Sequence, residues 1–191
     1  EAGGIVKNKF DKDTQKSKIV NESVLFKILK SNSKSEIGTK LNFDKIKSIE
    51  DYKRRVPLTE YSYYEDYINR ITKGEKNILT KEDVEYFGHT SGTTGKQKLI
   101  PSTKSGRRAA AKYMALLVNK ISYDNFKENW NYGKGLMIAD IVMSTYTDCG
   151  IPICSATSGG MKSIRHILPY LYTSPIEIME IRDKEASIYL H

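Results

Sequence analysis

A run of hydroxyl- and glycine-bearing residues, followed by two lysines, carries the clearest chemistry in this chain. The run spans Thr90 to Gly95, and Lys96 and Lys98 come directly after it. Glycines let the backbone approach a ligand closely, so that successive amides converge on one anion. Hydroxyls add further donors, and a lysine adds a positive charge. The pattern therefore predicts a loop that holds the phosphates of a nucleotide.

The Walker loop, G-x-x-x-x-G-K-[ST], is the first motif to compare with this stretch. The chain has Thr90 where that motif needs its first glycine, and Gln97 where it needs a hydroxyl for magnesium. The Walker interpretation therefore fails at two required positions. An ordinary surface turn is the other interpretation, because Ser, Thr and Gly are common loop residues. The two lysines and the strand-like pair Leu99–Ile100 favour the phosphate loop.

The order of residues from Thr90 to Lys98 resembles the phosphate loop of acyl-adenylate-forming enzymes, roughly [ST]-S-G-[ST]-[ST]-G-x-x-K. Its ending, Lys98-Leu99-Ile100-Pro101, is similar to the auxin-responsive Gretchen Hagen family of acyl acid–amino acid amido synthetases and its bacterial relatives. Segments 55–59, 64–68, 71–74 and 172–177 resemble the same family, and we expect a bacterial-type member. His89 and Gln97 depart from the family's usual residues, although neither change removes a donor.

The resemblance implies an ATP-dependent ligase that adenylates a carboxylic acid and then passes the acyl group to an amine or amino acid. It implies Lys98 as the catalytic charge partner and Mg²⁺ as a bridge between phosphates. Arg107 or Arg108 would bind the substrate carboxylate, with a solvent-facing pair as the alternative. The residues implied to hold ATP are Thr90, Ser91, Gly92, Thr93, Thr94 and Gly95.

Other functions stay open from the residues alone. An acyl-CoA ligase would share the adenylation step, and a degraded or split synthetase is a further possibility. Lys and Arg number 31 and Asp and Glu 23, an excess of 31 − 23 = 8, so a basic nucleic-acid-binding module also needs weighing. The lysines are spread along the chain without a block, which favours a mixed-charge surface instead.

The remaining composition indicates a cytoplasmic protein. No apolar run reaches membrane-spanning length, because Lys112 interrupts the run from Ala109 to Val118. Cys149 and Cys154 do not form a CxxC pair, so we interpret them as packing residues in a reducing compartment. We expect no protein metal site, no nucleic-acid or membrane partner, and an undetermined oligomeric state.

The expected fold class is α/β. Helices in a segment 1–84 precede 85–191, the first part of an adenylating-enzyme N-terminal domain with a mostly parallel sheet. The family's adenine-binding acidic motif and C-terminal domain do not appear, so we expect an N-terminal fragment that is inactive alone. Periodicity and capping patterns predict helices over 13–30, 48–54, 63–72, 104–122, from Pro175, and from Asp183.

Strands are expected on both sides of the phosphate loop, over 85–87 and 97–100. The apolar run 135–142 is typical of a buried parallel strand, and 151–154 of a short edge strand that tolerates Pro152. Residues 155–160 are expected to form a second Ser/Thr/Gly loop, either an ordinary connection or part of the acyl pocket. Ser102 or Thr103 should cap the helix that follows the phosphate loop. Met114, Leu117, Val118 and Ile121 should form the buried face of that helix.

Overall fold

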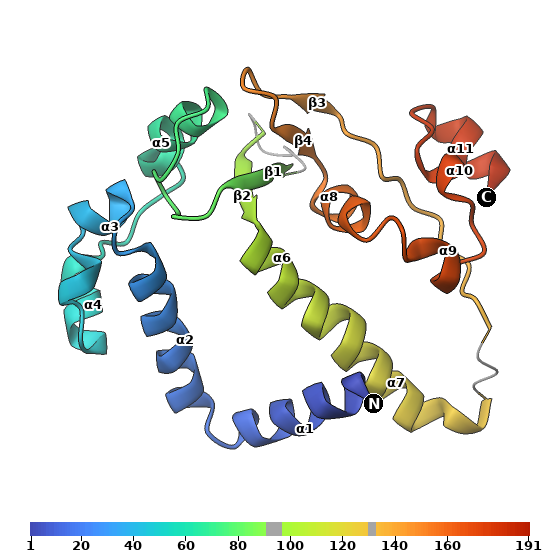
Figure 1. Ribbon diagram of the computed structural model, residues 1–191, viewed down its shortest axis with the longest axis horizontal. Helices are drawn as coiled ribbons and strands as arrows, with labels where there is room; N and C mark the ends of the chain where they lie inside the picture. The colour runs from blue at the N-terminus through green and yellow to red at the C-terminus, as the bar shows by residue number, and fades with distance from the viewer. Residues whose placement is uncertain (91–96, 130–132) are drawn as a thin grey trace. The chain divides into compact units, whose positions relative to one another are not determined.

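The chain forms two compact units, seen in a computed structural model that describes residues 1–90, 97–129 and 133–191 (Figure 1). The first unit comprises Glu1–Asp83 and Lys104–Asn125, and the second comprises Val84–Thr103 and Phe126–His191. Helices and one four-stranded sheet are both present, which confirms the α/β class. No helix in the described ranges is long and apolar enough to pass through a lipid bilayer.

The first unit is helical. The helix predicted over 13–30 is observed as α2, and it begins only at Ser17. A separate helix, α1, precedes it and was not predicted. The elements of this unit are α1 (Ala2–Thr14), α2 (Ser17–Asn32), α3 (Glu36–Lys40), the 3₁₀ turn η1 (Phe43–Lys45), α4 (Ile49–Arg55), α5 (Ser62–Thr72), α6 (Lys104–Ala111), the π-helical turn η2 (Lys112–Leu117) and α7 (Val118–Phe126).

Capping signals were confirmed in α4 and misplaced in α5. The Ser48 hydroxyl accepts a hydrogen bond from the Asp51 N–H at 3.0 Å, as an N-cap residue should. In α5, by contrast, Ser62 is already the first helical residue, and Tyr61 occupies the cap position without a side-chain bond. Tyr61 has helical backbone angles, so the helix begins one residue earlier than the Ser62–Glu65 spacing indicates.

The long helix after the phosphate loop is confirmed as the continuous run α6–η2–α7, but its buried face was predicted wrongly. Only Leu117 is buried, at 6 % exposure, whereas Met114 is 70 % exposed and Val118 and Ile121 are also exposed. The partner of this run is α1, which packs against η2 (Figure 1). Because α1 was not predicted, the face of the α6–η2–α7 run that α1 covers could not be predicted either.

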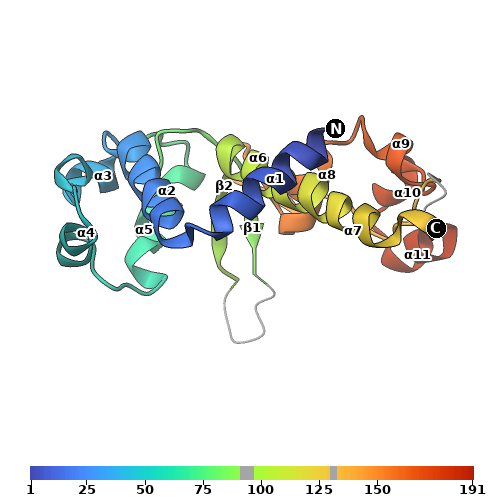
Figure 2. The ribbon, with the colours of Figure 1, turned by 90° about the horizontal axis from the view of Figure 1, so that it is seen from below.

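The second unit is built on a mixed sheet in the order β2-β1-β4-β3. Strands β1 and β2 are antiparallel and lie side by side (Figure 2), β1 and β4 are parallel, and β3 and β4 are antiparallel. The mostly parallel sheet was therefore a wrong expectation for the described residues. The elements are β1 (Val84–His89), β2 (Leu99–Thr103), η3 (Lys127–Asn129), β3 (Thr145–Tyr146), β4 (Pro152–Cys154), α8 (Ala156–Ser163), α9 (Leu168–Leu171), α10 (Ile176–Met179) and α11 (Lys184–Leu190).

Three segments of this unit differ from their predicted form. Residues 135–142 form no strand and make a single bridge, Gly135 to Tyr172, while Leu136 and Ile138 stay exposed. Strand β4 lies inside the sheet rather than at its edge, and Pro152 is tolerated as its first residue. Residues 155–160 begin a helix instead of forming a loop. The first two differences involve pairing with distant segments, whereas the third has a local cause in the Ser155 N-cap.

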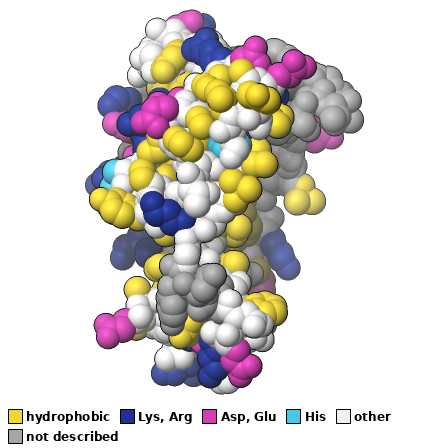
Figure 3. Space-filling model, turned by 90° about the vertical axis from the view of Figure 1, so that its right-hand side faces the viewer, with side chains coloured by type: hydrophobic (Ala, Val, Ile, Leu, Met, Phe, Trp, Pro, Cys, Tyr) yellow, Lys and Arg dark blue, Asp and Glu magenta, His cyan; other side chains and the backbone are white. Residues whose placement is uncertain are grey.

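The core of the second unit lies beneath the sheet and between its helices. Phe87 of β1 and Cys154 of β4 are fully buried, and a second cluster holds Ile141, Leu168, Ile176 and Met179. Large apolar side chains are also exposed on the C-terminal helices, and hydrophobic side chains gather on that side of the molecule (Figure 3).

Helix α8 sits against β1 through a contact that only glycine allows. A Cβ built on Gly159 would lie 2.4–2.6 Å from three ring atoms of Tyr86, closer than real carbon atoms approach. The Tyr86 hydroxyl also donates to the Ala156 carbonyl at 3.4 Å. The Tyr86 ring therefore sets how closely the first turns of α8 approach β1.

We predict that Gly159→Ala destabilises the protein by about 1–3 kcal/mol, because the added methyl overpacks a filled site. Gly160→Ala is the matched control, since a Cβ there meets nothing within 4 Å and alanine favours a helix. Urea unfolding followed by circular dichroism measures both variants. Equal stability of the two variants would contradict the packing of Tyr86 on α8.

Candidate functional site

The predicted phosphate loop connects β1 to β2 and is closed at its base by two hydrogen bonds. The Thr90 N–H donates to the Lys98 carbonyl at 3.2 Å, and the Lys98 N–H donates to the Thr90 hydroxyl at 3.3 Å. His89 and Leu99 are paired just below. The flanking strands were thus predicted correctly. The predicted ATP-binding residues Ser91, Gly92, Thr93, Thr94 and Gly95 lie outside the described residues.

The parallel pairing of β1 with β4 brings a second element to the same edge of the sheet. Phe87 pairs with Ile153 and Gly88 with Cys154, so both strands end together. The phosphate loop follows β1, and the N-terminus of α8 follows β4, with Ser155 as its cap. Ligands of open α/β sheets bind outside the carboxyl ends of the strands, where such loops and helix N-termini meet.

A compact hydrogen-bond network fixes the beginning of α8. The buried Ser158 hydroxyl donates to Asp140 at its carboxylate, 2.8 Å away, and lies 3.0 Å from the Asp140 carbonyl. The Ser155 hydroxyl accepts from the Ser158 N–H at 2.9 Å and lies 2.7 Å from the Ser158 hydroxyl. The network ties segment 135–142 to α8, and it places polar groups at the edge where the phosphate loop begins.

A cavity of about 530 Å³ opens beside this edge, within the second unit. His89, Asp140, Ser144, Ser155 and Ser158 are among the residues that line it. His89 Nε2 lies 3.5 Å from the Ser144 hydroxyl, and His89 Nδ1 is a buried polar atom without a hydrogen-bond partner among the described residues. The volume suits a small organic substrate, and the polar lining could orient it.

Arg107 and Arg108 lie on α6, as predicted, in the compact unit that does not contain the loop strands. Arg107 is half-buried and Arg108 is exposed. The Ser105 N–H donates to the Glu82 carboxylate at 3.0 Å, so a residue 23 positions upstream supplies a cap for α6. Thr103, one of the two predicted cap residues, stands directly before α6, whereas the bond from Glu82 was not predicted.

The two cysteines differ in environment. Cys154 is fully buried at the end of β4, whereas Cys149 is exposed, and neither forms a disulfide. Burial raises the pKa of the Cys154 thiol above its usual value, and an N–H from Gly159 partly opposes that shift. Within the described residues, no group of three or more His, Cys, Asp or Glu side chains could hold a metal ion.

Sequence reasoning missed most of the residues that line the cavity. Ser155 and Ser158 were seen as members of a loop, although their spacing of three is also that of an N-cap and its first bonded amide. Asp140 lay inside a run that was expected to be a strand. His89 was not predicted to line a cavity, because its contact with Ser144 joins residues that lie 55 positions apart in the sequence.

Taken together, the fold and the site define an α/β unit with a hydroxyl- and glycine-rich loop at the carboxyl edge of a parallel strand pair. Residues 6–191 match the GH3 family N-terminal domain. The chain belongs to this family, which is the Gretchen Hagen family that the loop and its flanks resemble.

Relatives of the chain include two plant proteins. One is a probable indole-3-acetic acid-amido synthetase of rice, 31 % identical over 185 residues that cover 92 % of this chain and 30 % of the relative. Another is a 4-substituted benzoates-glutamate ligase of Arabidopsis thaliana, 26 % identical over 93 % of this chain and 32 % of that protein. The chain thus spans about a third of their length. These relatives are plant proteins and give no support to the predicted bacterial-type assignment.

The fold also matches a solved structure, the GH3.15 acyl acid amido synthetase. The TM-score is 0.82 and the sequence identity 24 %, over 96 % of this chain and 32 % of that one. At this identity the match supports the fold.

We predict that only Cys149 reacts with a thiol reagent such as dithionitrobenzoate in the folded protein, because Cys154 is buried and its thiolate is disfavoured. Absorbance should show one reacting thiol in buffer and two in urea. In the control variant Cys149→Ala, the folded protein should show none. Fast labelling of that variant without denaturant would mean that β4 is not packed as described.

Proposed function

We propose that this chain forms the phosphate-binding part of an ATP-dependent acyl acid amido synthetase. One observation carries the proposal: the hydroxyl- and glycine-rich loop starts and ends at the Thr90–Lys98 hydrogen bonds, at the carboxyl edge of the β1–β4 pair. Membership of the GH3 family and the names of its relatives support the same reaction class. In this proposal residues 85–191 begin the adenylation domain, after a helical segment 1–84.

The chemistry begins with two anions that repel each other. A carboxylate oxygen attacks the α-phosphorus of ATP, which gives an acyl-adenylate and releases pyrophosphate; an amine then displaces AMP to form the amide. The attacking carboxylate is already ionised, so this first step needs positioning and charge neutralisation rather than a general base. His89 accordingly has no catalytic role in the proposal.

Each part of the loop has a distinct task. Amides and hydroxyls of residues 91–95 would bind the β- and γ-phosphates, and Lys98 would neutralise their charge. Thr90 would hold the loop closed, since its hydroxyl already accepts from the Lys98 N–H. Mg²⁺ would enter as the ATP complex, with phosphate oxygens as its ligands.

The second substrate is proposed to be a small carboxylic acid, with an amino acid as the acyl acceptor. The 530 Å³ cavity beside the loop base supports an acid of this size. The names of the relatives point to aryl acids, namely indole-3-acetic acid and substituted benzoates. Arg107 or Arg108 stays a separately proposed carboxylate ligand, because neither residue lines this cavity, whose own cationic side chains are Arg182 and Lys184. We also propose a cytoplasmic location, because both cysteines are thiols.

We predict that Lys98→Ala slows acid-dependent ATP–pyrophosphate exchange by the complete protein about 10- to 100-fold, because the variant loses one charged hydrogen bond to the phosphates. Lys81→Ala, which removes an equal charge from an exposed site outside the loop, should leave the rate unchanged. Because Lys98 is exposed, both variants should unfold at the same temperature as the parent. An unchanged exchange rate in Lys98→Ala would remove Lys98 from the reaction.

A further inference from the structure

A groove lies between α2 and η1 in the first unit, remote in sequence from the phosphate loop. It is open to solvent and has a volume of about 390 Å³. Leu29 and Ile46 are each only 4 % exposed and form its floor, while the aromatic rings are half-buried at its walls. The apolar side chains that line it are Phe26, Leu29, Phe43 and Ile46.

The walls of the groove are held in place by the chain around them. Asn42 has a left-handed backbone, with φ of 53°, and starts η1 so that Phe43 lies beside α2. A Cβ on Gly38 would lie 2.0 Å from the Asn32 carbonyl and 3.1 Å from the Phe43 ring. Ser35 is fully buried, donates to the Asn32 carbonyl at 2.8 Å and caps α3. The groove is thus built before any ligand arrives, which lowers the free energy needed to fill it.

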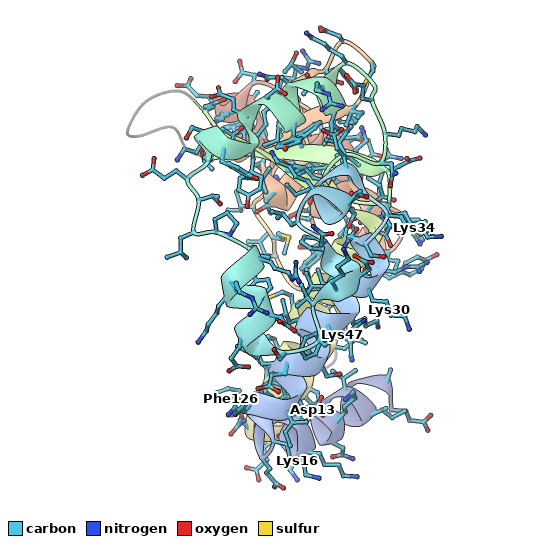
Figure 4. The ribbon with its side chains drawn as sticks, turned by 90° about the vertical axis from the view of Figure 1, so that its left-hand side faces the viewer. Asp13, Lys16, Lys30, Lys34, Lys47 and Phe126 are labelled. Carbon is cyan, nitrogen blue, oxygen red and sulfur yellow. The ribbon has the colours of Figure 1, made fainter. Side chains whose placement is uncertain are left out.

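The rim of the groove is charged. Lys30 and Lys47 line it from α2 and from the residue after Ile46, and both side chains point outward on the face seen in Figure 4. Neither ammonium group forms an ion pair with a residue in the described ranges. Asp44 adds one carboxylate, so the lining has two positive charges and one negative charge. The net charge is +1.

We propose that this groove is a binding site for a small monocarboxylate with an aryl or medium-chain alkyl body. The apolar floor would bury the hydrocarbon, which the hydrophobic effect favours, and the two lysines would pair with the carboxylate. A single net positive charge matches a monoanion better than a phosphate dianion. The site lies in a different unit from the proposed ATP loop, and the inference does not depend on the proposed function.

The test is titration calorimetry of the complete protein with sodium octanoate, and with octanamide as the uncharged counterpart. The double variant Lys30→Gln/Lys47→Gln should weaken octanoate binding about tenfold, because two exposed charge pairs are lost. Lys16→Gln/Lys18→Gln is the matched control, since it also removes two positive charges from exposed sites. Lys18 lies in α2 and Lys16 directly precedes that helix. The control should bind octanoate as the parent does.

A second variant tests the floor without changing any charge. Ser33→Trp places a large ring in the groove from its half-buried rim and should abolish octanoate binding, with the melting temperature as a check on folding. Lys98→Ala should leave this binding intact, which separates the groove from the ATP loop. The proposal is overturned if octanoate does not bind, if both lysine double variants weaken it equally, or if Ser33→Trp binds as tightly as the parent. If another polypeptide segment or a second copy of the chain covers the groove, octanoate will not bind.

Discussion

The parallel pairing of β1 with β4 is the constraint on which the proposed site depends. Its register ends both strands together, so the loop after β1 and the first turn of α8 emerge at one edge of the sheet. Antiparallel pairing of β1 with β2 then closes the loop at Thr90 and Lys98. Gly159 allows α8 to approach Tyr86, which sets the helix start against the same strand. Without this pairing, the loop would be an ordinary hairpin connection.

Local signals in the sequence predicted the parts of the site that need only local structure. The two strands that flank the loop and the long helix after it were predicted correctly, because turn residues and apolar periodicity act over a few positions, whereas residues 91–96 of the loop lie outside the described residues. Parts that depend on distant partners were not identified. Segment 135–142 had the composition of a strand, yet the structure pairs it with the region before α10 instead. Likewise, the Glu82 cap of α6 lies 23 residues upstream.

The two units divide the surfaces available for chemistry. The second unit holds the loop base and a cavity with His89, Asp140 and two serines in its lining, which suits a small polar-headed substrate. The first unit holds Arg107 and Arg108 on a helix that follows β2 directly, and also the lysine-rimmed groove. The proposed amide synthesis concerns the first of these surfaces, whereas the groove is argued from its own geometry and charge.

The central claim is that main-chain amides of the loop bind the phosphates of ATP, and proton–nitrogen correlation spectra test it most directly. Titration of the complete protein with magnesium ATP should shift the amide signals of Gly92 and Gly95 saturably. Pyrophosphate should shift the same signals, while those of Gly150 and Gly160 stay in place. If the two loop glycines do not move as ATP saturates the protein, the loop does not hold the phosphates, and the assignment to ATP-dependent adenylation loses its basis.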